Sequence, residues 1–245
     1  LAVKLIDIGE VIKTGTSVMN EVNSEIRWQL LMTEKGYPFF LRLIDFHFGK
    51  RFIFIFTDLC RGDLSLIPMI SNYRRDHVMR LVFQAGIALS LFHAHGLIHR
   101  DIKIENILVK QENQNFIAFI ADFGLARAKD EAFVKGGSEG YMAPEVSKKF
   151  ARKSGKIDVY ALNAVLTYLM FSEFDKDGSY NLLSMKEINM ILKESLSKGI
   201  ISQEIFGLIR EGFQYDQDIR PTMLEYIEHK AFVPLHREFK NELSL

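Results

Sequence analysis

The sequence predicts an α+β protein in two parts, a small strand-rich part followed by a larger helical part. Short apolar runs separated by turn residues fill residues 1–59, whereas residues 60–245 are dominated by apolar side chains at helical spacing. Of the 245 residues, 48% are hydrophobic, which is enough to fill a core in a chain of this length. We expect a hinge at residues 58–61 to join the two parts.

The first part is predicted to contain one helix among strands. Residues 17–34 place apolar side chains on one side of a helix, which ends before Pro38. The turn residues before Phe52 predict a hairpin. The opening run reads as the interior of a strand, so we expect the sequence to start inside a domain. Strands are predicted for three apolar runs: residues 1–7, 39–48 and 52–57.

The second part is predicted to be mostly helical. Residues 78–92 keep helical spacing throughout and predict a buried amphipathic helix. Residues 107–109 and 116–120 predict a second small hairpin. The same spacing predicts four further helices, at residues 157–171, 185–196, 205–213 and 223–232.

Composition narrows the classes of function. Lys and Arg number 31 and so do Asp and Glu, so no overall charge favours nucleic acid as a partner. The single cysteine excludes an internal disulfide framework and suits a reducing compartment, so we expect an intracellular protein, in the cytoplasm or alternatively the nucleus. The apolar run at 159–171 is shorter than the ~18 residues that span a bilayer, and no secretion leader opens the sequence, so no membrane span is expected.

Three short motifs in a fixed order carry the chemistry. They are His99-Arg100-Asp101-Ile102-Lys103-Ile104-Glu105-Asn106, Asp122-Phe123-Gly124 and Ala143-Pro144-Glu145. Five specified positions in the first motif, followed by two more motifs in order, argue against coincidence. On these residues the chain resembles a eukaryotic-type protein kinase of the serine/threonine branch, nearly end to end. The resemblance implies a two-lobed fold, the cofactors ATP and Mg²⁺, and a protein substrate with a serine or threonine acceptor.

The resemblance assigns roles to four motif residues. Phosphoryl transfer needs positioning and neutralisation of charge more than covalent work from the protein. Asp101 would accept the proton of the acceptor hydroxyl, and Lys103 would contact the transferred phosphate. Asn106 and Asp122 would supply the hard oxygen ligands that Mg²⁺ prefers.

The lysine that clamps the nucleotide phosphates is expected at Lys4. In the family this lysine pairs with a helix glutamate. Glu25 is the first choice, because apolar residues follow it as buried neighbours would, and Glu21, about one helical turn earlier, is the alternative. No Gly-x-Gly-x-x-Gly precedes Lys4. Either the first strands lie outside this sequence or the domain lacks its phosphate lid, and the intact downstream motifs favour the first.

Residues 54–60 resemble the strand that leads into a kinase hinge. Thr57 would be the gatekeeper, and the backbone of Asp58 and Cys60 would bind adenine. Cys60 is interpreted as an ordinary small residue rather than a reactive thiol. Further nucleotide contacts are expected from the side chains around the ring and the ribose: Ala2, Leu108 and Asp63.

Residues 137–145 resemble the peptide-docking segment, in which Ser138 would bond to the catalytic aspartate and lysine. Arg100 normally marks kinases switched on by a phosphate, yet residues 125–137 contain no serine, threonine or tyrosine. We therefore predict that this segment orders without phosphorylation, with Asp130 or Glu131 near Arg100. A solvated acidic pair is the alternative.

Three residues are expected to hold the site rather than perform chemistry. Asp158 would hydrogen-bond the catalytic-loop backbone, and Glu145 and Arg220 would form a buried ion pair. Two other functions remain open: a catalytically weak or silent kinase-fold scaffold, and a small-molecule phosphotransferase. The motif ending at Glu145 and the turn at Arg220 argue against the second, because they build a shelf for a peptide.

Overall fold

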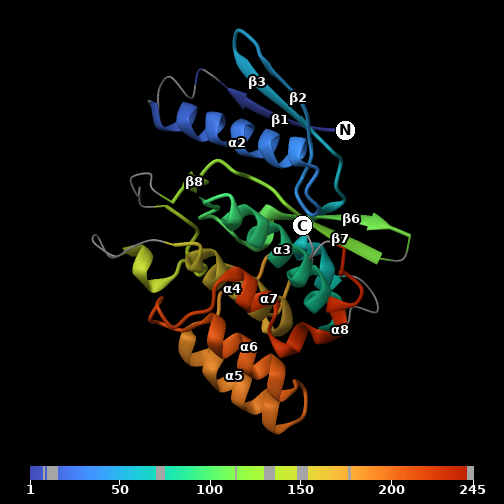
Figure 1. Ribbon diagram of the computed structural model, residues 1–245, viewed down its shortest axis with the longest axis vertical. Helices are drawn as coiled ribbons and strands as arrows, with labels where there is room; N and C mark the ends of the chain where they lie inside the picture. The colour runs from blue at the N-terminus through green and yellow to red at the C-terminus, as the bar shows by residue number, and fades with distance from the viewer. Residues whose placement is uncertain are drawn as a thin grey trace.

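The computed structural model describes residues 1–7, 9, 16–69, 75–113, 115–129, 136–147, 154–175 and 178–241. A small sheet with one helix stands on a larger helical body (Figure 1). The predicted α+β, two-lobed fold is therefore confirmed. Asp130 and Glu131 lie outside the described residues.

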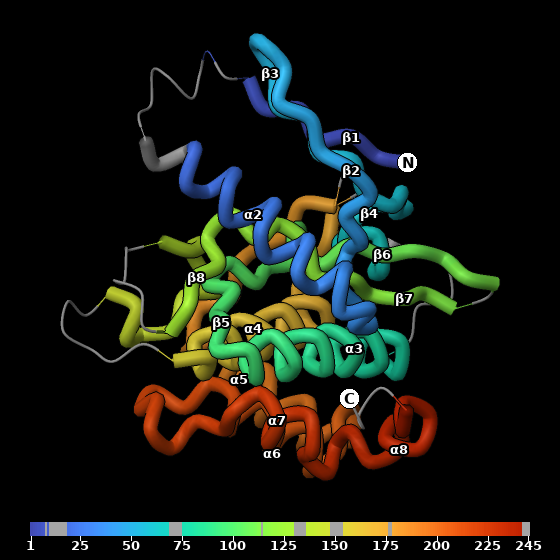
Figure 2. Tube along the Cα trace, turned by 45° about the horizontal axis from the view of Figure 1, so that its top comes forward, coloured from blue at the N-terminus to red at the C-terminus, as the bar shows by residue number. Residues whose placement is uncertain are grey.

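The small sheet is antiparallel and has the strand order β1-β3-β2. The helix α2 lies between this sheet and the helical body (Figure 2). It packs against the inner face of the sheet through a cluster of five buried residues: Val22, Ile26, Leu43, Ile53 and Ile55. The elements are β1 (Ala2–Asp7), α2 (Thr16–Lys35), β2 (Leu43–Phe48) and β3 (Phe52–Thr57).

The strand predicted for residues 39–48 starts only at Leu43. Phe39 has a φ of 63°, a left-handed backbone that ends strand geometry. The segment bonds instead to the strand β7 (Asn115–Ile120): Ile120 N donates to Phe39 O at 2.8 Å, and Leu41 N donates to Ile120 O at 2.9 Å. A seam of backbone hydrogen bonds therefore joins the small part to the helical body.

The helical body forms around α3 (Arg75–Ala94) and α4 (Lys156–Phe171), whose side chains are buried along most of their length. A large hydrophobic cluster surrounds these two helices. The other helices are α5 (Met185–Ser197), α6 (Gln203–Gly212), α7 (Met223–Ile227) and α8 (Val233–His236). The short strands are β4 (Gly62–Asp63), β5 (Leu97–Ile98), β6 (Ile107–Glu112) and β8 (Arg127–Ala128).

The single helix predicted for residues 223–232 is wrong. The helix α7 ends at Ile227, and a separate 3-10 turn spans Lys230–Phe232. Between them His229 is extended, with φ −60° and ψ 147°, and its Nδ1 accepts a hydrogen bond from Ala231 N at 3.1 Å. A side chain that caps the next turn interrupts the helical run.

Among the described residues, α3 is the helix long and apolar enough to cross a bilayer. Two thirds of that window, 67%, is buried inside the protein, which is the pattern of a core helix.

The division between residues 1–59 and 60–245 stays a prediction. The five-residue cluster under the sheet supports a separate small core. However, Trp28, Met32, Phe39 and Phe40 from the first part belong to the large cluster. The end of α2 and the turn after it are thus packed as part of the helical body.

Candidate active site

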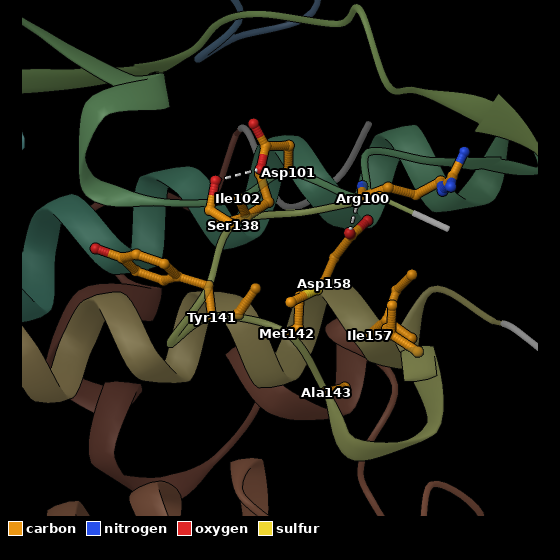
Figure 3. Close-up of a pocket in the computed structure, with 12 residues that line it drawn as sticks. Arg100, Asp101, Ile102, Ser138, Tyr141, Met142, Ala143, Ile157 and Asp158 are labelled. Atoms are coloured by element: carbon orange, nitrogen blue, oxygen red, sulfur yellow. Dashed lines mark hydrogen bonds between the residues drawn. The ribbon is translucent and has the colours of Figure 1, made fainter. Parts of the chain in front are cut away.

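The loop that follows β5 is held by Asp158, which α4 places underneath it. Asp158 is 1% exposed, and its two carboxylate oxygens accept hydrogen bonds from His99 N and Arg100 N, each at 2.8 Å. Figure 3 shows the bond to Arg100. His93 Nε2 lies 2.8 Å from Asp158 Oδ2. Burial acts to raise the pKa of Asp158, but these partners outweigh it and hold that pKa below its ordinary value.

This support is needed because the loop backbone is strained. Arg100 has a φ of 73°, which is uncommon for a residue with a side chain. The carboxylate of Asp158 binds the amide of Arg100 itself, so it fixes the turn that presents Asp101.

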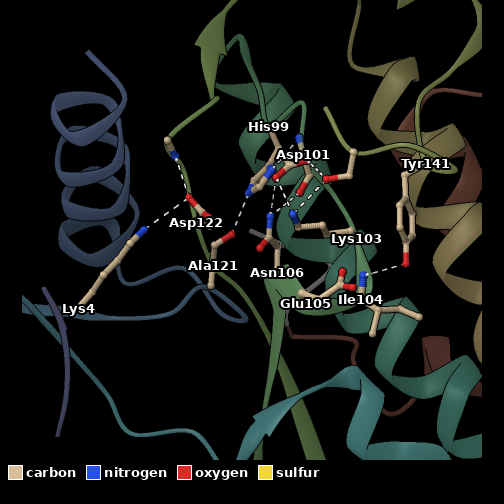
Figure 4. A network of polar contacts seen from close by, with 12 residues as sticks. Lys4, His99, Asp101, Lys103, Ile104, Glu105, Asn106, Ala121, Asp122 and Tyr141 are labelled. Carbon is tan, nitrogen blue, oxygen red and sulfur yellow. Dashed lines mark hydrogen bonds and ion pairs between the residues drawn. The ribbon is translucent and has the colours of Figure 1, made fainter. Parts of the chain in front are cut away.

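Asp101 lies at the centre of a polar network. Its Oδ1 accepts a hydrogen bond from Ser138 Oγ at 2.8 Å, and its Oδ2 accepts one from Asn106 Nδ2 at 2.9 Å (Figure 4). Lys103 Nζ donates to Ser138 Oγ at 3.0 Å and lies 3.4 Å from Asp101 Oδ2. The loop and the predicted docking segment therefore meet at one carboxylate.

Asn106 and Asp122 form a donor set that fits Mg²⁺. The Asn106 amide nitrogen is engaged by Asp101, at the backbone oxygen and at Oδ2, so the amide oxygen is the atom left to act as a ligand. Asp122 follows β7 with a φ of 59°. Among the described residues no group of three or more His, Cys, Asp or Glu side chains could hold a metal. Such a pair suits Mg²⁺, which completes its shell with phosphate oxygens and water.

Lys4 joins β1 to α2 through Glu25. Its Nζ lies 2.8 Å from both carboxylate oxygens of Glu25, and 3.8 Å from Asp122 Oδ1. Burial acts to lower the pKa of Lys4, but Glu25 and then Asp122 outweigh it, so that pKa is raised. Glu21, the alternative partner, lies beside Gly124. A Cβ added to Gly124 would lie 3.7 Å from the Cβ of Glu21.

The predicted hinge residues begin at the end of β3. Ala2 lies opposite Thr57 in the sheet, and Thr57 is buried. Asp58 N donates to Arg42 O at 3.3 Å, so a contact between the Asp58 backbone and a base has to use the carbonyl oxygen. Cys60 is half-buried, and burial raises the pKa of its thiol, which keeps it protonated.

The remaining two expected nucleotide contacts lie across a different sheet. Asp63 in β4 pairs with Leu108 in β6. The Asp63 carboxylate accepts a hydrogen bond from Ser65 N at 2.8 Å, which positions it at the start of the following turn. The structure thus brings Asp63 and Leu108 together, and separately Ala2 and Thr57.

A small pocket lies beside Asp101, between the loop that follows β5, residues 136–146 and α4. It is lined by Ser138, Tyr141, Met142 and Val146, among others (Figure 3). The predicted docking segment is anchored by Glu145, whose carboxylate oxygens lie 2.6 Å and 3.1 Å from Arg220 Nη1 and Nη2.

Sequence reasoning missed the residues that tie α2 to the segment after Gly124. Trp28 Nε1 donates to Ala126 O, and Arg127 Nη1 donates to Ser24 Oγ. The available signals were weak: Trp28 is the only tryptophan of the chain, and Arg127 follows Gly124 by three positions. Arg100 Nη1 donates to Leu125 O at 3.2 Å. Its predicted contact with Asp130 or Glu131 lies outside the described residues.

The fold and this arrangement define a protein kinase. The protein kinase domain model matches residues 1–232, and the chain belongs to that family. ATP binding is inherent to this domain. The chain is 28% identical to a calcium/calmodulin-dependent protein kinase cmkB of Emericella nidulans over 84% of its length and 53% of the relative's.

Two further relatives show similar identity and coverage. The chain is 25% identical to CBL-interacting serine/threonine-protein kinase 13 of Arabidopsis thaliana, over 95% of this chain and 46% of the relative. It is 28% identical to serine/threonine-protein kinase ULK3 of Xenopus laevis, over 81% and 43%. The chain thus spans about half the length of these curated relatives.

Proposed function

We propose that this protein transfers the γ-phosphate of Mg²⁺-bound ATP to serine or threonine hydroxyls of protein substrates. One observation carries the proposal: Asp101 is hydrogen-bonded at once to Asn106, a candidate metal ligand, and to Ser138, in the candidate docking segment. A phosphate donor held on one side and an alcohol held on the other would meet at this carboxylate.

The residues have distinct tasks in this proposal. Asp101 orients the acceptor hydroxyl and takes its proton. Lys103 neutralises charge on the transferred phosphoryl group, and Lys4, held by Glu25, binds the other phosphates. Asn106 and Asp122 would hold Mg²⁺, which when bound bridges the phosphate oxygens and lowers their charge.

The preference for serine and threonine rests on two supports. Lys103 contacts Ser138 next to the aspartate, as in the serine/threonine branch. Relatives named serine/threonine-protein kinases align over most of the chain. Analysis of which phosphoamino acids form on a substrate tests this part directly, and phosphotyrosine alone would contradict it.

Transfer of labelled phosphate from ATP to a generic basic protein, with Mg²⁺ present, tests the proposal. Asp101→Asn should lower kcat by about 10²–10⁴-fold, the contribution typical of a general base. Asp45→Asn, on the exposed part of β2, is the matched control and should leave kcat unchanged. Stabilisation of the wild-type protein by ATP without any transfer would instead support the silent scaffold. Transfer to small alcohols alone would support the small-molecule phosphotransferase.

A further inference from the structure

The helix α2 is attached to the segment after Gly124 at two points on one face. Trp28 is 7% exposed, and its Nε1 donates to Ala126 O at 3.3 Å. Four residues earlier on the same helix, Ser24 Oγ accepts a hydrogen bond from Arg127 Nη1 at 2.7 Å. Residues four apart lie on the same side of a helix, so the two contacts together fix the distance of α2 from this segment and its rotation about its own axis.

The Arg127 guanidinium is itself held in place. Its Nη1 also donates to Ala126 O at 2.7 Å and to Gly124 O at 3.1 Å. Its backbone lies in β8, opposite Ile98 of β5, immediately before the catalytic loop. These contacts thus fix the position of α2 relative to the β5–β8 strand pair, which also leads into the loop that carries Asp101.

The segment that receives α2 is attached to the helical body by other groups. Arg100 Nη1 donates to Leu125 O at 3.2 Å, and Lys129 N donates to Gly96 O at 2.9 Å. Lys129 Nζ donates to His93 O at 3.0 Å. Residues 125–137 offer no serine, threonine or tyrosine to carry a phosphate.

We propose that Trp28, Ser24 and Arg127 form a positioning anchor that keeps α2 where Glu25 meets Lys4, so that the protein is active without a phosphate on residues 125–137. Glu25 adjoins Ser24, so any displacement of α2 at this point moves the partner of Lys4 directly. This inference concerns the regulation of the same site and rests on the proposed function.

The test uses Ser24→Ala and Arg127→Met in phosphatase-treated protein whose lack of phosphate is verified by mass spectrometry. Wild-type protein should transfer phosphate in this state. Ser24→Ala and Arg127→Met should each lower kcat about tenfold, as expected for the loss of a hydrogen bond with a charged donor. The double variant Ser24→Ala/Arg127→Met should be no slower than Arg127→Met alone, because each single substitution already removes the hydrogen bond between Ser24 and Arg127.

Two matched variants and one second readout separate positioning from general damage. Asn23→Ala, exposed beside Ser24 on α2, should behave as wild type. Arg127→Lys, which keeps a donor, should recover part of the activity. Amide hydrogen exchange in α2 should speed up in Ser24→Ala and Arg127→Met, while exchange in α4 stays unchanged.

Wild-type rates of transfer and of α2 exchange in both variants would overturn the anchor. Loss of wild-type activity on phosphatase treatment would overturn the independence from phosphate. If the wild-type protein transfers no phosphate under any condition, the proposed function fails, whereas the exchange measurement still decides the anchor.

Discussion

Glu145 and Arg220 lie 75 positions apart in the chain and form a two-pronged ion pair in the interior. Their side chains are 4% and 0% exposed. Arg220 also donates to Lys156 O at 2.9 Å and to Gln214 O at 2.8 Å, so its donors are satisfied from several directions. This pair fixes the predicted docking segment to the turn before α7 and so helps to position Ser138 relative to Asp101.

Removing one partner of this pair should destabilise the fold strongly. Glu145→Ala leaves a buried guanidinium without its counter-charge, and the free energy of unfolding should fall by roughly 3–5 kcal/mol. Urea denaturation measures the change. Glu194→Ala, which breaks the exposed pair with Lys198, is the control and should leave the free energy of unfolding nearly unchanged. Equal losses in the two variants would contradict this account of burial.

The pairing of Lys4 with Glu25 should be visible in the kinetics. Glu25→Gln keeps the shape but removes the charge that orients Lys4, so kcat/KM for ATP should fall at least about tenfold. Glu21→Gln, the same change one turn earlier, should stay within about twofold. Steady-state kinetics with varied ATP decides between them. A larger effect at Glu21 would reassign the partner of Lys4.

Ser138 should affect the acceptor side more than the nucleotide side. Ser138→Ala removes a hydrogen bond to Asp101 and one from Lys103, so kcat for a protein substrate should fall about tenfold with little change in KM for ATP. Ser138→Thr keeps the hydroxyl and should retain most of the activity. Ser147→Ala, in the exposed turn nearby, is the control. A rise in KM for ATP alone would contradict the assignment.

The free energy of unfolding should decrease as the pH is lowered, because His99 is buried and neutral. Its Nδ1 accepts from Asp101 N at 3.4 Å, so Nε2 carries the hydrogen toward Ala121 O. Burial lowers the pKa of His99 below 6.5, despite the nearby carboxylates of Asp158, Asp122 and Asp101.

The sign of the effect follows from where the proton binds. Below pH 6.5 the unfolded chain takes up a proton that the folded protein refuses, so stability drops as pH falls, by at most about 1.4 kcal/mol per pH unit. Urea denaturation between about pH 7.5 and about pH 5 should show a shallower slope for His99→Gln than for wild type. His47→Gln, exposed on β2, should keep the wild-type slope. Identical slopes in all three proteins would refute the role of His99.

Local pattern was sufficient wherever the structure depends on local chemistry. The helix predicted at residues 185–196 is observed as α5, and Ser184 and Glu187 cap its start reciprocally. The motif residues could be grouped from their order alone because their chemistry requires a common location. The structure joins Ser138 to both Asp101 and Lys103, and Asn106 to Asp101, by hydrogen bonds.

What could not be predicted depends on contacts between distant backbone groups. Nothing in the apolar run 39–48 indicates that Phe39 adopts a left-handed backbone, because that conformation is stabilised by Ile120, far along the chain. The contact of Arg127 with Ser24 spans 103 positions and leaves no periodic signal. The helix break after Ile227 depends on one histidine side chain turning back to cap the next turn.

The seam between residues 39–41 and Ile120 has a consequence for motion. Ile120 lies two positions before Asp122, so the turn that ends α2 is hydrogen-bonded to the strand that leads to a candidate metal ligand. The outer end of the small sheet, by contrast, is held mainly through the flank of α2. We therefore expect any opening or closing over a nucleotide to displace the outer ends of the strands while the hydrogen-bonded seam keeps its place.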